Sequence, residues 1–152
     1  MKVKEGDQFP NFELTDHLGD QFTLHEEHDT KYRVLYFYPK DETPGCTRQA
    51  CYFRDYSHVY KEYDCEIIGI SADNKKSHEK FIQKYNLPFR LLTDHKSRLR
   101  KDLGIPKDLF GLAPGRVTFL LNEKHEILFI FRSALNMKSH ITSVLNFLDK
   151  NK

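Results

Sequence analysis

The most informative stretch of this sequence runs Tyr38-Pro39-Lys40-Asp41-Glu42-Thr43-Pro44-Gly45-Cys46-Thr47-Arg48-Gln49-Ala50-Cys51. It follows an apolar run, Tyr32 to Tyr38, which predicts a buried β-strand. Thr43 and Pro44 favour the N-cap and the first helical position, so a helix is predicted to begin just before Cys46. A strand, a short loop and a helix are therefore expected here, with a cysteine in the first helical turn.

A cysteine in this position has an unusual electrostatic environment. The first turn of a helix presents unpaired backbone N–H groups and the positive end of the helix dipole, and both stabilise an anion. We therefore expect Cys46 to favour the thiolate, the reactive form of cysteine. Making a free cysteine thiol mostly ionised at neutral pH takes about 3 kcal/mol, whereas the helix dipole supplies at most ~2 kcal/mol. The sequence thus predicts an additional cation near Cys46.

Arg116 is the candidate for that cation. It stands at the start of an apolar segment directly after the turn Ala113-Pro114-Gly115, so we expect it at the end of a strand. Its guanidinium is a rigid fork of donors that can face a thiolate and a peroxide oxygen together. The alternative interpretation is an exposed charge at a strand end.

These residues carry a resemblance to a known family. Pro39, Thr43 and Cys46 match the Pro-x-x-x-Thr-x-x-Cys signature of the peroxiredoxins, and Cys51, five positions later, resembles the bacterioferritin comigratory protein (PrxQ) subfamily. The resemblance extends over nearly the whole chain, through Gly6-Asp7-Gln8-Phe9-Pro10-Asn11-Phe12, Ile68-Gly69-Ile70-Ser71-Ala72-Asp73, Leu87-Pro88-Phe89-Arg90-Leu91-Leu92-Thr93-Asp94 and Gly115-Arg116-Val117-Thr118-Phe119-Leu120.

The resemblance implies a thiol-dependent peroxidase that reduces hydrogen peroxide and organic hydroperoxides. Cys46 would become a sulfenic acid, Cys51 would resolve it as an intramolecular disulfide, and a thioredoxin-like dithiol would reduce that disulfide. Thr43 and Arg116 would organise the peroxide, and Pro39 would shield the sulfur from water. The resemblance implies no cofactor and no metal, and a monomer or weak dimer.

The five-residue spacing of the two cysteines makes a prediction of its own. Along a helix it corresponds to a rise of about 7.5 Å and a rotation of roughly 140°. A disulfide needs Cα atoms within about 7 Å and converging Cβ vectors. We therefore expect the first turns of the helix to unwind before Cys51 reaches Cys46.

The remaining pattern predicts one α/β domain over residues 1–152, an α/β sandwich of a central mixed β-sheet flanked by helices, with an N-terminal β-hairpin. The name thioredoxin-like fold comes from the resemblance. Strands are expected at 12–14, 21–24, 32–38, 65–71, 89–92, 117–121 and 126–131, and helices at 46–63, 74–85, 96–103 and 138–149.

Composition excludes several classes of function. The net charge is +2 with acids and bases interspersed, which predicts no nucleic-acid site and no anionic membrane partner. No apolar run is long enough to span a bilayer, and the first residues lack the apolar segment of a secretion signal, so we expect a cytoplasmic protein. An odd number of cysteines, three, argues against a disulfide framework.

Several alternatives stay open at the level of sequence. Cys46 and Cys51 could form part of a metal site or be incidental, although no second ligand pair is evident. Cys65 is expected to be a buried small residue, with a resolving role as the alternative. Arg48 is expected on a solvated helix face, and the basic residues between Lys96 and Lys107, including Arg100, on another. The rival functions are a thiol–disulfide oxidoreductase, which normally uses Cys-x-x-Cys, and a non-catalytic redox sensor.

Overall fold

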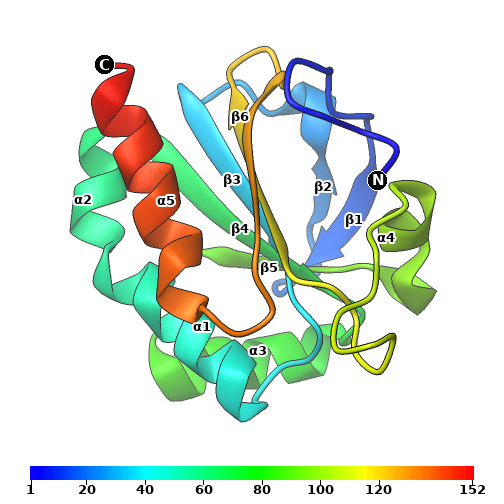
Figure 1. The fold of residues 1–152 in the computed structure, drawn as a ribbon. Coiled ribbons are helices and arrows are strands. Elements are labelled where there is room, and N and C mark those ends of the chain that lie inside the picture. The colour runs from blue at the N-terminus through cyan, green and yellow to red at the C-terminus, as the bar shows by residue number, and fades with distance from the viewer.

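The computed structural model describes residues 1–152, and one mixed seven-stranded β-sheet forms its centre (Figure 1). Along the sheet the strand order is β2-β1-β5-β4-β3-β6-β7. The three central strands β5, β4 and β3 are parallel, and the other neighbours are antiparallel. The bounds are β1 Glu13–Asp16, β2 Gln21–Thr23, β3 Tyr32–Phe37, β4 Cys65–Ser71, β5 Arg90–Thr93, β6 Val117–Asn122 and β7 Ile127–Arg132.

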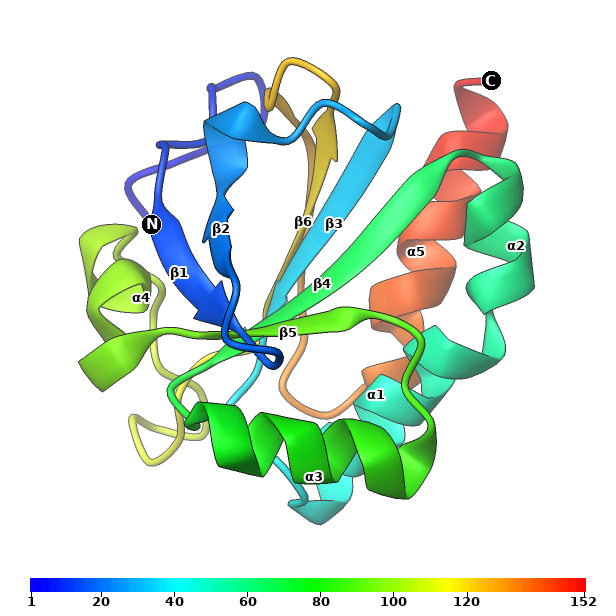
Figure 2. The same cartoon turned by 180° about the vertical axis from the view of Figure 1, so that it is seen from behind.

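Helices cover both faces of the sheet. Figures 1 and 2 show α1, α2 and α5 along one side, and α4 with the N-terminal segment along the other. The helices are α1 Pro44–Asp55, α2 Ser57–Glu62, α3 Lys75–Tyr85, α4 Arg98–Asp102 and α5 Met137–Lys150, with 3₁₀ turns at Leu24–Glu26 and His95–Ser97. None of them is both long and apolar enough to cross a membrane.

Strand β3 is buried on both faces, as its continuous apolar sequence predicts. Val34 and Tyr36 pack into the core beneath α1 and α5, while Leu35 and Phe37 pack into the second core, beneath α4 and the N-terminal segment. The central position of β3, between β4 and β6, fixes the point at which the chain leaves the sheet after Phe37. The following loop and the start of α1 are therefore attached to the most buried strand.

Two predicted helices differ from those in the structure. The helix expected over 46–63 begins at Pro44 and breaks at Tyr56 (ψ 9°), between α1 and α2. Asp55 and Ser57 flank the break, and such side chains compete with the helix for backbone hydrogen bonds. The helix expected over 96–103 shortens to α4, because Lys96 and Ser97 adopt left-handed conformations (φ 56° for both).

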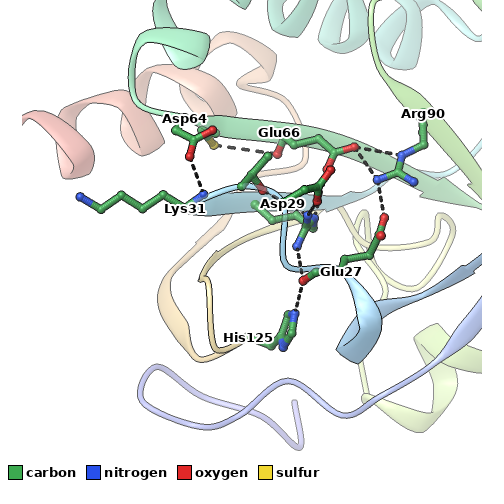
Figure 3. Close-up of polar contacts among 10 residues, drawn as sticks. Glu27, Asp29, Lys31, Asp64, Glu66, Arg90 and His125 are labelled. Carbon is green, nitrogen blue, oxygen red and sulfur yellow. Dashed lines mark hydrogen bonds and ion pairs between the residues drawn. The ribbon is translucent and has the colours of Figure 1, made fainter.

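A network of ion pairs lies at the amino ends of the three parallel strands (Figure 3). Arg33 of β3 is buried and pairs with Glu66 of β4 at 3.2 Å and with Asp29 at 3.1 Å. Arg90 of β5 pairs with Glu66 and with Glu27, both at 2.6 Å. Glu66 thus joins the two arginines, and both guanidinium groups have carboxylate partners.

Candidate active site

The opposite end of the sheet carries Cys46. The loop that leaves β3 leads directly into α1, and Cys46 is the third residue of that helix and is buried (1 % exposed). The first helical hydrogen bond runs from the N–H of Thr47 to the carbonyl oxygen of Thr43, at 2.8 Å. The N–H groups of Gly45 and Cys46 donate to no protein acceptor. Two unused backbone donors therefore lie in the turn that holds the sulfur.

The guanidinium of Arg116 packs against this same turn. Arg116 immediately precedes β6 and is 8 % exposed, and its Nη1 donates to Oε1 of Gln49 at 2.7 Å. A Cβ atom added to Gly45 would lie 2.9 Å from Nη2 of Arg116. The absence of a side chain at Gly45 therefore makes room for the guanidinium of Arg116. The sequence placed Arg116 at a strand end; the structure brings it to the start of the helix that carries Cys46.

Gln49 was not singled out by the sequence. It is fully buried one turn after Cys46, and its Nε2 has no hydrogen-bond partner. Gln49 lies three residues after Cys46 and therefore on the same helix face. This spacing is the sequence feature that could have identified it as a neighbour of the site. Arg48 is exposed, as expected for a solvated helix residue.

Arg100 corrects the expectation of a solvated basic face between Lys96 and Lys107. It is 9 % exposed, and its guanidinium donates to the carbonyl oxygens of Gly115 (2.5 Å) and Tyr38 (3.5 Å). Burial lowers the pKa of Arg100, and the negative charges of Asp94, Asp108 and Cys46 oppose that shift. Neither Arg100 nor Arg116 forms an ion pair through its side chain with any carboxylate. Neither guanidinium therefore has an ion-pair partner, although the negative charges of Asp94 and Asp108 favour the charged form of Arg100.

Thr43 and Pro39 lie in the loop that precedes Cys46. Thr43 occupies the N-cap position but makes no capping hydrogen bond; its hydroxyl donates to the carbonyl oxygen of Lys40 at 2.9 Å. The hydroxyl oxygen therefore keeps its acceptor capacity, and its hydrogen is used within the loop. Pro39 is half-buried.

A buried polar network fixes the middle of this loop. The carboxylate of Asp41 accepts from the hydroxyl of Tyr38 (2.5 Å), from the hydroxyl of Ser77 (2.9 Å) and from Nδ1 of His78 (2.7 Å). Burial, followed by the charge of Asp41, raises the pKa of Tyr38, which belongs to the core. Because Ser77 and His78 lie on α3, the network ties the loop to a second helix.

The comparisons with known proteins agree with this architecture. The sequence profile described as the AhpC/TSA family matches residues 5–130. This chain belongs to the AhpC/TSA family. Chloroplastic peroxiredoxin Q of Triticum aestivum is 46 % identical over 147 residues, which cover 97 % of this chain and 67 % of that protein. The corresponding protein of Arabidopsis thaliana is 45 % identical and is covered to 68 %.

Solved structures extend the similarity to the fold. Peroxidoxin BcpB from Mycobacterium tuberculosis superposes with a TM-score of 0.89 at 30 % identity, covering 99 % of each chain. A cysteine-to-serine mutant of PrxQ from Xylella fastidiosa gives 0.86 at 28 % identity, covering 98 % of this chain and 97 % of that one. The thioredoxin-like fold, with a central mixed sheet flanked by helices, and the resemblance to PrxQ proteins are both confirmed.

The cysteines of this AhpC/TSA-family chain are all free thiols. Cys51 is half-buried on α1, and burial raises its pKa. Cys65 is buried at the start of β4, where burial raises its pKa to about 12, as expected for a small core residue. No group of three or more His, Cys, Asp or Glu side chains is arranged to hold a metal ion. Cys46 and Cys51 lie on one uninterrupted helix, the arrangement that separates their sulfurs.

Proposed function

We propose that Cys46 is the nucleophile of a thiol-dependent peroxidase that reduces hydrogen peroxide and organic hydroperoxides to water and alcohols. Membership of the AhpC/TSA family and the likeness to peroxiredoxin Q proteins give the activity. The observation that carries the assignment to Cys46 is the pair of buried arginines whose guanidinium groups form no ion pair, one of them packed against the turn that holds the buried sulfur. Buried cations are ordinarily paired, so this site favours an anion, and a thiolate at Cys46 supplies one.

The proposed reaction uses the groups that already surround the sulfur. The Cys46 thiolate attacks one peroxide oxygen and the O–O bond breaks, so sulfur is oxidised to sulfenic acid while the leaving oxygen takes the electron pair and then a proton. Arg116 and the free N–H groups of Gly45 and Cys46 are donors for that developing charge. Thr43 offers an acceptor for the hydroperoxide hydrogen, and Pro39 limits access of water to the loop.

Cys51 is proposed to complete the cycle. Its thiolate attacks the Cys46 sulfenic acid, so that a disulfide forms and water leaves. A thioredoxin-like dithiol then reduces this disulfide by thiol–disulfide exchange, becomes oxidised itself and regenerates both thiols. The separation along the helix is about 7.5 Å with a rotation of roughly 140°, so an intact α1 does not allow the bond. Unwinding of the first turns of α1 is therefore part of the proposed cycle.

The activity is tested by peroxide turnover with thioredoxin, thioredoxin reductase and NADPH. We expect sustained NADPH oxidation by the wild type, loss of turnover in Cys46→Ser, and wild-type rates in Cys65→Ser, the matched control for a buried thiol. A single stoichiometric oxidation that then stops would identify a redox sensor instead. Turnover that survives Cys46→Ser would refute the assignment of the nucleophile.

The role of Cys51 is tested separately. We expect Cys51→Ser to complete one fast turnover and then to become over-oxidised or to depend on small thiols. Unchanged steady-state turnover with thioredoxin would point to another resolving thiol. Amide hydrogen exchange over residues 44–54 should increase in the disulfide form; equal protection in the reduced and disulfide forms would contradict the unwinding step.

A further inference from the structure

We propose that Arg100 is a positioning residue for the reaction at Cys46. Its side chain holds the segment that carries Arg116 next to the segment that carries Pro39, and it adds a second positive charge to the site. The proposal rests on the function proposed for Cys46. Arg100 belongs to α4, on the other side of the sheet from α1, so its connection to the site depends entirely on how far its buried side chain reaches.

The hydrogen bonds of Arg100 end on the two segments that flank the site. One runs to the carbonyl oxygen of Gly115, the residue before Arg116, and the other to the carbonyl oxygen of Tyr38, the residue before Pro39. Gly115 is itself packed closely against Pro106, because an added Cβ atom there would lie 2.0 Å from the carbonyl oxygen of Pro106. One guanidinium therefore joins the loop before α1 to the loop before β6.

The guanidinium of Arg100 forms no ion pair with a carboxylate. Asp94 is near, but its two carboxylate oxygens accept from the backbone N–H groups of Leu99 (2.8 Å) and Arg100 (3.0 Å). The guanidinium lies 5.9 Å from the ring centroid of Phe37, an aromatic surface that accommodates a cation without neutralising it.

The coupling between Arg100 and Cys46 acts in both directions. Burial lowers the pKa of Arg100 and Arg116 lowers it further, whereas Asp94, Asp108 and a negative Cys46 raise it. A thiolate at Cys46 thus stabilises the charged form of Arg100. By linkage, the charged Arg100 stabilises the thiolate by the same free energy. Removing this charge should therefore make Cys46 harder to ionise, even when no peroxide is present.

The test compares Arg100→Gln, which keeps donors for one carbonyl but removes the charge, with Arg100→Lys, which keeps the charge but loses the planar fork. Arg98→Gln is the matched control, because Arg98 lies on the same helix and is exposed. The first readout is the pH dependence of alkylation of Cys46 by iodoacetamide, in a Cys51→Ser and Cys65→Ser background. The second is kcat/KM for hydrogen peroxide in the chain with all three cysteines.

We expect Arg100→Gln to raise the pH midpoint of alkylation by about one unit, at the low end of the effect of an opposite charge, and to lower kcat/KM by ~10-fold or more. Arg100→Lys should keep the wild-type midpoint and still lose part of kcat/KM, because one ammonium group does not hold both carbonyls. Arg98→Gln should match the wild type in both readouts.

A wild-type midpoint in Arg100→Gln overturns the proposal and leaves Arg100 a structural residue. If Arg100→Gln does not fold, the test uses Arg100→Lys, which keeps the positive charge. An alkylation midpoint raised by a full unit in folded Arg100→Lys would show that the charge at position 100 does not act on Cys46. The alkylation readout does not require turnover. If the wild type showed no peroxidase activity, the function proposed for Cys46 would fail while the coupling to Arg100 was still measured.

Discussion

The two ends of the parallel strands use arginines in opposite ways. At the amino ends, Arg33 and Arg90 share the carboxylate of Glu66, so their charges are cancelled within the network of Figure 3. At the carboxyl ends, the guanidinium groups of Arg100 and Arg116 donate only to carbonyl or amide oxygens, and neither has an ion-pair partner. A cancelled charge stabilises the fold and exerts little field beyond its partner. An uncompensated charge is costly for the fold and provides the field that a thiolate needs.

The largest expected effect tests the uncompensated end. Arg116→Met should lower kcat/KM for hydrogen peroxide by ~10²–10³-fold, the loss typical of removing a donor to developing negative charge. Stability should change little, since no carboxylate loses its partner; Gln49 loses one hydrogen bond, about 1 kcal/mol. Stopped-flow oxidation of Cys46 and urea unfolding measure the two quantities. A large loss of stability with unchanged activity per folded molecule would contradict this prediction, because Arg116 would then stabilise the fold as the arginines at the amino end do.

The mirror substitution tests the compensated end. Arg33→Met should lower the free energy of unfolding by about 3 kcal/mol, because it removes all four hydrogen bonds of a buried guanidinium. The folded fraction should retain the wild-type kcat/KM. Urea unfolding provides the measurement. Arg54→Met is the control with an expected loss of about 1 kcal/mol, because it removes a partly exposed pair with Asp55 and one hydrogen bond to the carbonyl oxygen of Tyr85. Reduced activity in folded Arg33→Met would show that the two ends are coupled.

The sequence revealed one of these ends better than the other. Pro39, Thr43 and Cys46 lie in one short stretch, so the chemistry proposed for them could be inferred without tertiary structure. Arg116 stands out because a turn precedes it and an apolar strand follows it.

The burial of Arg100 and Gln49 near the site could not be predicted from the sequence, for a physical reason. Charged and polar residues in a helix are usually solvated, and the packing of α4 and α1 against the sheet is what buries these two. The same limit applies to the fold. Periodicity located most of the strands and helices, but the insertion of β5 between β4 and β1 depends on contacts between distant segments. The pairing of Arg33 with Glu66 depends on the register of β3 against β4 and was equally invisible.

A pH dependence of stability should follow from the burial of His140 next to the carboxyl end of the sheet. His140 of α5 is fully buried; its Nε2–H donates to the carbonyl oxygen of Ser133 (2.9 Å), so Nδ1 accepts from the hydroxyl of Thr118 (2.7 Å). Burial lowers the pKa of His140 to about 4, a hydrogen bond to Ser133 opposes the shift, and the charge of Arg116 adds to it.

The sign of this effect is fixed by which state binds the proton. Between about pH 6.5 and pH 4 the unfolded chain protonates this histidine while the folded chain does not. Stability should therefore fall by ~3 kcal/mol as the pH drops through that window. Urea unfolding of the wild type and His140→Gln at several pH values isolates the contribution, which should be absent in the variant. A smaller dependence in Arg116→Met would tie it to the uncompensated charge; an identical slope in wild type and His140→Gln would rule out His140 as its source.

The smallest expected effect separates burial from pairing at the amino end. Arg90 shares Glu66 with Arg33, but its side chain is 30 % exposed, compared with 1 % for Arg33. Arg90→Met should therefore cost about 1 kcal/mol, because water replaces much of the lost interaction and Glu66 keeps Arg33. Unfolding in low and high salt gives the discriminating measurement: salt should shrink the effect of Arg90→Met and leave that of Arg33→Met nearly unchanged, since buried pairs are screened less. Equal losses for both arginines would mean that the shared carboxylate, rather than the depth of each cation, sets the stability of this end.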